Sequence, residues 1–267
     1  MAKESKKKKT PASGGFELSP WILFFIATTL LVAGWLMKSF PLLITVALSP
    51  LFAITDKTYS EEKFWTYAEL ILISLTISLL AGHIFQLSYL ISAIIQAIGY
   101  TLAFVGYGFV HQTLGPRVGK FTIIIFWLGI EYVFLKLQWP ADHLFLADAV
   151  QLKTDWLNWT FHTGYLGASL WILTTNLMFY LAFFKGGKFD WTWLVVFLII
   201  LIAPIGFSYT TELNGISRED MMALYLNAEN ESNGIYLKRG EFIPRTTAWI
   251  SVLIFIFALV KSKTQKK

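Results

Sequence analysis

The amino-acid sequence predicts an all-α integral membrane protein with about eight transmembrane helices and both termini in the cytoplasm. Of its 267 residues, 55% are hydrophobic and only 15% are charged, and the mean hydropathy is +0.57. Soluble domains contain about 45–50% apolar and about 25% charged residues. The apolar residues also form runs long enough to cross a bilayer, and basic residues gather between alternate runs.

Residues 1–19 are predicted to form a basic cytoplasmic tail, which includes the run KKKK. The tail lacks the short apolar region and small-residue cleavage site of a signal peptide. The first apolar run is long and carries Trp21 and Trp35, so we interpret it as a retained helix. The lysines have no interleaved arginines or aromatic residues, so we expect no nucleic-acid partner.

Apolar segments account for most of the remaining chain. Residues 20–209 are expected to form a membrane domain of seven helices, and 246–267 the last transmembrane helix with a basic cytoplasmic end. Pro41 and Pro50 bracket a short second segment, which predicts a tight helical hairpin with the first. The segments cover 20–37, 41–55, 64–82, 87–111, 121–138, 164–184, 191–209 and 246–260.

The distribution of charge in the loops predicts the topology. Most of the 22 basic residues fall on one side if the tail is cytoplasmic, and the outer loops are the longer ones. This is the positive-inside pattern with an even number of spans. The cytoplasmic set is Lys3, Lys6, Lys7, Lys8, Lys9, Lys57, Lys63, Arg117, Lys120, Lys185, Lys188, Lys261, Lys263, Lys266 and Lys267; the outer set is Lys38, Lys136, Lys153, Arg218, Lys238, Arg239 and Arg245.

Two outer segments are long enough to have structure of their own. Residues 138–162 are rich in Trp, Asp and His and are expected to lie at the membrane surface or to fold back into it. Residues 210–245 are polar and are expected to form a short extracytoplasmic segment, long enough for one short helix and a turn.

Polar and small residues inside the apolar segments are the first candidates for a site. Glu131 lies within FWLGIEYVF, and an ionisable group at membrane depth should face the bundle interior, either as a functional group or as a buried structural carboxyl. Asn176 is predicted to make an interhelical hydrogen bond. Gly164, Gly167 and Ala168 are predicted to allow close helix packing.

The outer histidines offer a second candidate site. His143 and His162 share the predicted outer surface with Asp142, Asp148 and Asp155, a set that includes possible metal ligands. The HExxH spacing of hydrolytic zinc sites is missing, so we expect no metal. Acid–base catalysis by one of these histidines remains an alternative to a surface that faces lipid headgroups.

Aromatic residues accompany the histidines on this surface. Trp139, Trp159 and Tyr165 fit the aromatic belt found at membrane interfaces. The chain has no cysteine, Walker loop, dinucleotide fingerprint or GxSxG elbow, so we expect no cofactor. The absence of cysteine also excludes disulfides and cysteine nucleophiles.

Several stretches together resemble the membrane domain of apolipoprotein N-acyltransferases, bacterial inner-membrane enzymes that add the third acyl chain to lipoproteins. They are FPLLITVALSPLFAITD, LGPRVGKFTIIIFWLGIEYVFLKLQWP, NWTFHTGYLGASLWILTTN and ESNGIYLKRGEFIPRTTAWISVLIFIFALVKSKTQKK. The resemblance covers about 20–209 and 232–267, and implies eight spans. The matching positions are Glu131, Trp139, Gly164, Gly167, Trp171 and Asn176.

The chain departs from that family where catalysis takes place. The family carries a nitrilase-like domain with a Glu–Lys–Cys triad between its seventh and eighth helices. Here only about residues 210–231 correspond to it, fewer than a folded domain needs. Without a cysteine, the thioester relay of that family cannot run on this chain.

These observations predict a non-catalytic protein of the bacterial cytoplasmic (inner) membrane. Its expected partners are membrane phospholipid, lipoprotein acyl chains or an envelope protein complex. The alternatives are the membrane subunit of a split lipoprotein N-acyltransferase with a separate nitrilase-like subunit, and a self-sufficient acyltransferase that uses His143 or His162. The expected lipid- or partner-binding residues are Glu131, Trp139, His143, Trp159, His162 and Tyr165.

Overall fold

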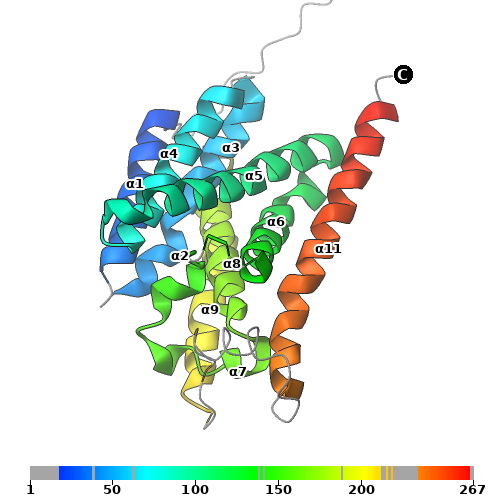
Figure 1. The fold of residues 1–267 in the computed structure, drawn as a ribbon. Coiled ribbons are helices and arrows are strands. Elements are labelled where there is room, and N and C mark those ends of the chain that lie inside the picture. Colours follow the sequence, from blue (N-terminus) through cyan, green and yellow to red (C-terminus); the bar gives the residue numbers. More distant parts are fainter. Residues whose placement is uncertain are drawn as a thin grey trace, which may run out of the picture.

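A computed structural model describes residues 18–37, 40–61, 64–137, 139–140, 142–187, 189–211, 215, 218 and 234–264. This part of the chain is built from helices, arranged as a bundle around α8 (Figure 1). The long helices are α1 (Pro20–Leu36), α3 (Ser49–Glu61), α4 (Phe64–Gly82), α5 (Leu90–Leu114), α6 (Pro116–Leu137), α8 (Leu166–Phe183), α9 (Trp191–Ser208) and α11 (Gly234–Thr264); the short ones are α2 (Ile44–Ala47), α7 (Thr160–Thr163) and the 3-10 turns η1 (Pro41–Leu43), η2 (Leu87–Tyr89), η3 (Leu146–Val150), η4 (Thr154–Trp156) and η5 (Lys185–Gly187).

The described part of the chain is all-helical, as the sequence predicts. Five helical stretches in the described residues are long and apolar enough to cross a bilayer, and Pro20–Leu36 is a shorter apolar helix. The five are Trp65–Gly82, Leu87–Leu114, Leu166–Gly187, Trp191–Ser208 and Arg245–Thr264.

The second predicted segment, 41–55, differs most from a simple span. It consists of η1, α2 and α3, and the chain turns at Leu48 between α2 and α3. Pro41 begins η1, and Pro50 lies in the first turn of α3, where a missing backbone N–H costs no hydrogen bond. α3 continues to Glu61, six residues beyond the predicted end.

The last helix is longer than predicted. α11 begins at Gly234, so the end of the segment 210–245, which was expected to hold one short helix and a turn, belongs to the last helix. Residues 212–214, 216–217 and 219–233 of that segment lie outside the described residues. α11 packs against α6, where a Cβ on Gly129 would lie only 3.2 Å from the Cα atom of Ala248.

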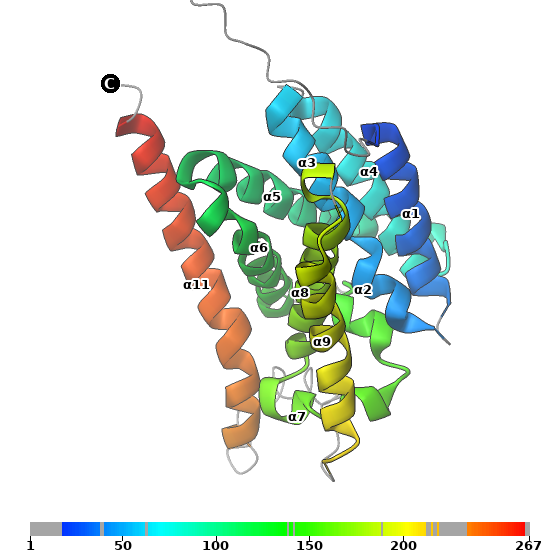
Figure 2. The same ribbon diagram turned by 180° about the vertical axis from the view of Figure 1, so that it is seen from behind.

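Burial divides the helices into a centre and a periphery. In α8, 78% of the spanning residues are buried, against 11% in α9 and 6% in α11. Figures 1 and 2 show α8 in the middle of the bundle and α11 along one side. The exposed surfaces of α9 and α11 are apolar, which is typical of helices surrounded by lipid.

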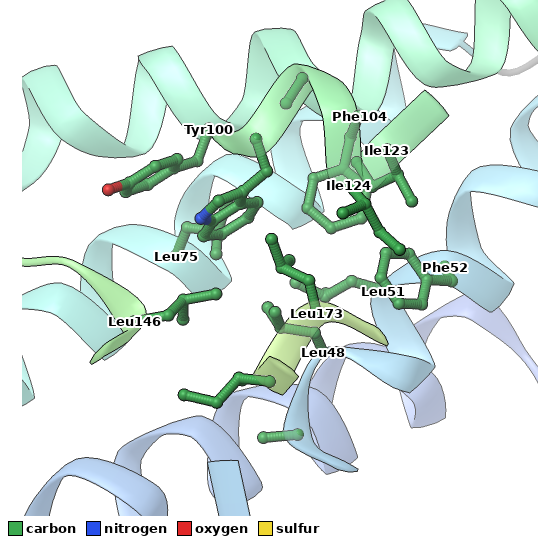
Figure 3. Packing of buried hydrophobic residues seen from close by; sticks show 14 of the residues in the cluster. Leu48, Leu51, Phe52, Leu75, Tyr100, Phe104, Ile123, Ile124, Leu146 and Leu173 are labelled. Carbon is green, nitrogen blue, oxygen red and sulfur yellow. The ribbon is translucent and has the colours of Figure 1, made fainter. Parts of the chain in front are cut away.

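The core is packed from segments far apart in the sequence. Leu48, Leu51 and Phe52 from α2–α3 meet Leu173 of α8 and Tyr100 and Phe104 of α5 (Figure 3). Tyr100 stacks on Trp127 with ring centroids 4.1 Å apart. α5 runs obliquely across the bundle (Figure 1), so one helix covers both α4 and α6.

Candidate functional site

Glu131 lies in the interior of the bundle, beneath the loop that follows α6. α6 holds it fully buried, and its Oε1 atom accepts hydrogen bonds from Trp127 Nε1 at 3.1 Å and from the backbone N–H of Leu146 at 3.0 Å. Ser169 of α8 lies beside the same carboxyl group. Oε2 has no hydrogen-bond partner among the described residues. Glu131 therefore ties α6 to the loop that follows it.

This loop, residues 142–165, folds over the end of the bundle and carries the second buried carboxylate, Asp148. Its Oδ1 atom accepts from the hydroxyl group of Tyr165, and its Oδ2 atom accepts from the backbone N–H of Phe145 at 2.8 Å and from Arg218. Arg218 also donates to the carbonyl oxygen of His143 at 2.6 Å and lies over the Phe145 ring. We call Asp148, Tyr165, Arg218 and His143 the outer cluster.

Burial and the neighbouring positive charge have opposite effects on the pKa of Asp148. Burial raises the pKa of this carboxyl group, while the Arg218 guanidinium and hydrogen bonds from Tyr165 and Phe145 lower it, and burial prevails. A carboxylate removed from water is stabilised only when it is paired in this way. The Asp148–Arg218 pair therefore fixes the loop against residue 218, 70 residues later in the chain.

His143 lies inside the loop and not on the predicted outer surface. Its side chain is 1% exposed, and its Nδ1 atom lies 3.0 Å from the carbonyl oxygen of Pro140. Its Nε2 atom is buried without a hydrogen-bond partner among the described residues. Burial lowers the pKa of His143, so the neutral ring donates from Nδ1 and leaves the Nε2 lone pair unused.

The other predicted binding residues lie apart from this cluster. Trp139 is 55% exposed, and His162 is exposed, with its ring near Phe207. Trp159 is half-buried and donates from Nε1 to the carbonyl oxygen of Trp156 at 3.0 Å. Glu131, His143 and Tyr165 are thus buried where the loop packs on the bundle, whereas Trp139, Trp159 and His162 are partly or largely exposed.

The predicted packing residues have different roles. Asn176 is fully buried and bridges α8 to α2 and α3, with Nδ2 donating to Ile44 O at 2.8 Å and Oδ1 accepting from Leu48 N at 2.7 Å. Ala168 is fully buried, and a Cβ on Gly167 would collide with Thr163. Gly164 has φ +80 and ends α7, so it forms a turn before α8 begins.

Arg218 is the residue of the outer cluster that sequence reasoning missed. It lies in a polar segment without periodicity, so no local pattern indicated that it reaches Asp148. Asp148 was considered only as a possible metal ligand, and within the described residues no group of three or more His, Asp or Glu side chains is arranged to hold a metal ion.

The outer cluster is suited to holding the loop in place. The carboxylate of Asp148 accepts hydrogen bonds from Tyr165, Arg218 and the backbone N–H of Phe145. The Nε2 atom of His143 has no hydrogen-bond partner among the described residues, so within them it does not make the contact with a hydroxyl group that activates a nucleophile. Comparison with protein-family models, with curated proteins and with solved structures gives no match.

Proposed function

We propose that the chain is a non-catalytic, multi-pass membrane protein that holds phospholipid or lipoprotein acyl chains against its peripheral helices. The observation that carries this proposal is the exposure of α9 and α11, in which only 11% and 6% of the spanning residues are buried. Ile199, Ile202 and Leu253 are each more than half exposed. Such surfaces need an apolar environment, which acyl chains supply.

The small size of the cavity inside the bundle indicates that acyl chains bind at the periphery. A small cavity lies between Trp35, Leu75, Tyr100, Trp127 and Leu146, with room for about one water molecule. The side chains that line this cavity belong to the closely packed core (Figure 3). The cavity therefore does not accommodate a hydrocarbon chain in this conformation. Acyl chains are therefore assigned to the exposed faces of α9 and α11.

The orientation in the membrane belongs to the same proposal. We place eight helical segments across the bacterial cytoplasmic membrane, with both termini in the cytoplasm. In support, α1 begins and α11 ends toward the same end of the bundle, and the turns α3–α4, α5–α6 and α8–α9 lie toward that end (Figures 1 and 2). The outer cluster lies toward the opposite end, beside the longer connections.

The non-catalytic part of the proposal rests on the chemistry of the chain. It has no cysteine to carry a thioester, and its two outer carboxylates are engaged in structural hydrogen bonds. The resemblance to the membrane domain of apolipoprotein N-acyltransferases supports a role with phospholipid or lipoprotein. A split enzyme, with the triad on a separate nitrilase-like subunit, is the second outcome that the experiment must distinguish.

The test is photocrosslinking in native membranes followed by mass spectrometry. Phospholipids with a photoreactive acyl chain are expected to label exposed residues of α9 and α11, with Ile199 and Leu253 as markers and buried Leu173 as the unlabelled control. The bound fraction is expected to be enriched in particular phospholipids or in lipoproteins. A bound fraction with the composition of the bulk membrane and no protein partner would overturn the proposal. Repeated recovery of a cysteine-bearing hydrolase crosslinked to residues 142–165 would favour the split enzyme.

A further inference from the structure

A proline interrupts the hydrogen-bond ladder of α9. Pro204 lies inside this helix and has no backbone N–H, so the carbonyl oxygen of Ile200, four residues earlier, has no helical partner. Gly206 follows two residues later, with open space where a Cβ would lie. A proline and a glycine so close together weaken a helix, so α9 bends here more readily than elsewhere along its length.

Trp171 of α8 supplies the partner that Pro204 cannot. Its Nε1 atom donates a hydrogen bond of 2.8 Å to the carbonyl oxygen of Ile200. Trp171 is 4% exposed and belongs to the helix at the centre of the bundle, so this donor is fixed in position. The contact replaces a hydrogen bond within α9 by one between two helices, at the point where α9 is weakest.

The two parts of α9 on either side of this point have different neighbours. The first part is anchored by Phe197, a buried residue whose ring packs edge-on against Phe179 of α8, with centroids 5.3 Å apart. The last part ends at Ser208, whose hydroxyl group donates to Trp156 O at 2.8 Å and whose carbonyl oxygen accepts from Asn158 Nδ2 at 3.3 Å. The end of α9 is thus bound to the loop that follows α6, beside η4 (Figure 2).

This part of the loop also contacts Trp171. The ring of Trp159 meets the ring of Trp171 edge-on, with centroids 6.3 Å apart, a separation at which aromatic rings attract each other. Trp159 Nε1 also donates to Trp156 O at 3.0 Å, the same carbonyl oxygen that accepts from Ser208. Trp171 therefore holds both the weak point of α9 and the stretch of loop to which the end of α9 is bound.

We propose that residues 201–208 of α9 form a hinged segment that moves together with residues 156–159 of the loop, and that Trp171 holds this unit against α8. The segment carries Ile202 and Phe207, which are both more than half exposed, so its movement changes the apolar face that α9 presents to its surroundings. A molecule that binds residues 156–159 would therefore alter this face by moving the same unit.

The hinge is independent of the acyl-chain contacts proposed above. It rests on the contacts that α9 makes with Trp171 and with the loop, whatever molecule covers the exposed side of the helix. Photolabelling of Ile199 tests the acyl-chain contacts, and the distance measurements below need no bound acyl chain of a particular kind. Each proposal therefore stands or fails alone.

The test is the measurement of distances between pairs of spin labels in the full chain, reconstituted in lipid nanodiscs. The chain has no cysteine, so labels attach only to the cysteines that are introduced. Gly206→Cys labels the hinged segment and Val195→Cys the first part of α9; each is paired with Phe25→Cys on α1, and both Val195 and Phe25 are more than half exposed. Trp171→Phe keeps an aromatic ring but removes the donor.

Trp171→Phe is expected to act on one label pair only. The population of displaced distances between positions 206 and 25 should grow about tenfold, because Ile200 O loses its only side-chain donor in the described structure. The distances between positions 195 and 25 should stay as in the wild type. Equal broadening of both pairs would show a general loosening of the bundle, and no change in either would show that Trp171 does not hold α9; both results overturn the proposal.

Pro204→Ala provides the rescue that a merely structural role of Trp171 would not give. Alanine restores a backbone N–H at position 204, which can donate to Ile200 O within the helix. In this background Trp171→Phe is expected to leave the distances between positions 206 and 25 unchanged. If Trp171→Phe displaces the segment as much with alanine as with proline at 204, the hydrogen bond to Ile200 is not what holds it, and the proposal fails.

Limited trypsinolysis tests whether the loop moves with the segment. Lys153 lies just before η4, with its ammonium group 5.8 Å from the centre of the Trp156 ring. Cleavage after Lys153 is expected to be about tenfold faster in Trp171→Phe, in step with the displaced population. Cleavage after Lys263, at the exposed end of α11, should keep its wild-type rate. An unchanged rate at Lys153 while the segment is displaced would show that the two parts are not one unit.

Discussion

The amide oxygen of Asn176 accepts a hydrogen bond of 2.7 Å from the backbone N–H of Leu48, a residue 128 positions earlier in the chain. Leu48 lies at the turn between α2 and α3, where the backbone leaves the regular helical pattern. The amide nitrogen of Asn176 donates to Ile44 O on the other side of this turn. One side chain therefore satisfies backbone groups that the broken helix leaves without helical partners.

Replacing Asn176 is expected to destabilise the bundle strongly. Asn176→Leu keeps a similar volume but removes the partners of Leu48 N and Ile44 O, at about 1–3 kcal/mol for each buried group left unpaired. Thr174→Val is the control, because Thr174 bonds only to Leu170 O within its own helix. Unfolding by SDS in mixed micelles measures the difference. Equal losses in the two variants would show that the bridge is not needed.

The acceptor function of Glu131, and not its charge, is expected to stabilise the loop. Glu131→Gln keeps an oxygen for Trp127 Nε1 and Leu146 N, so it should change the free energy of unfolding by no more than about 1 kcal/mol. Glu131→Leu leaves both donors unpaired, at about 1–3 kcal/mol each. Limited proteolysis of residues 142–165, together with SDS unfolding, reports both effects. If Gln is as harmful as Leu, the carboxylate charge is what the fold requires.

Acidification is expected to destabilise the protein through His143. Burial holds the pKa of folded His143 below 6.5, helped by Arg218 and opposed by the hydrogen bond to Pro140 O and by Asp142. Below about pH 6.5 the unfolded chain therefore binds a proton that the folded chain does not. Stability falls as pH falls through this range, by at most about 1.4 kcal/mol per pH unit.

The contribution of His143 can be isolated by substitution. His143→Asn retains a donor near the position of Nδ1 and should flatten the dependence of unfolding temperature on pH between about 5 and 7. His162→Asn changes an exposed histidine and should keep the wild-type slope. The same slope in the wild type and in His143→Asn would assign the acid sensitivity to another group.

Substitution by alanine is expected to destabilise the protein at Gly167 but not at Gly206. A Cβ on Gly167 would lie 2.8 Å from the Cβ of Thr163, so Gly167→Ala should cost about 1–3 kcal/mol by overpacking. Gly206 of α9 has open space around it, and alanine there should be neutral or stabilising by about 0.5–1 kcal/mol. Thermal unfolding of both variants measures this, and a neutral Gly167→Ala would mean that Thr163 moves aside without cost.

The long apolar helices were predictable because their signal is local. The predicted segments 64–82, 164–184 and 191–209 match α4, α8 and α9 within two residues, since Gly82, the turn at Gly164 and Asp190 mark their ends. The inward position of Glu131 followed from the cost of exposing a carboxyl group to lipid. The buried position of Asn176 followed from the same reasoning about hydrogen bonds in membranes.

The polar clusters were not predictable, because each joins residues whose separation in sequence carries no pattern. Asp148 and Arg218 meet across 70 residues, and Asp56 and Tyr180 across 124. The early start of α11 was not predicted, because the charged residues Lys238, Arg239 and Arg245 interrupt the apolar run that marks a membrane helix. His143 was placed on the surface because a histidine near tryptophans is typical of an interface, whereas Pro140 O and Phe145 enclose it.

The burial of Glu131 has a consequence for how the protein is made. Apart from Glu131 and Lys136, the second half of α6 is apolar, yet α6 is not among the five described stretches whose length and composition suit a membrane span. In the proposed eight-span arrangement, α6 needs a companion that covers its polar face while both leave the translocon. α5 is joined to α6 through Gly115 alone and packs along it, so the two helices should insert as a pair. An insertion assay that compares α6 alone with α5–α6 measures this coupling, and full insertion of α6 alone would rule it out.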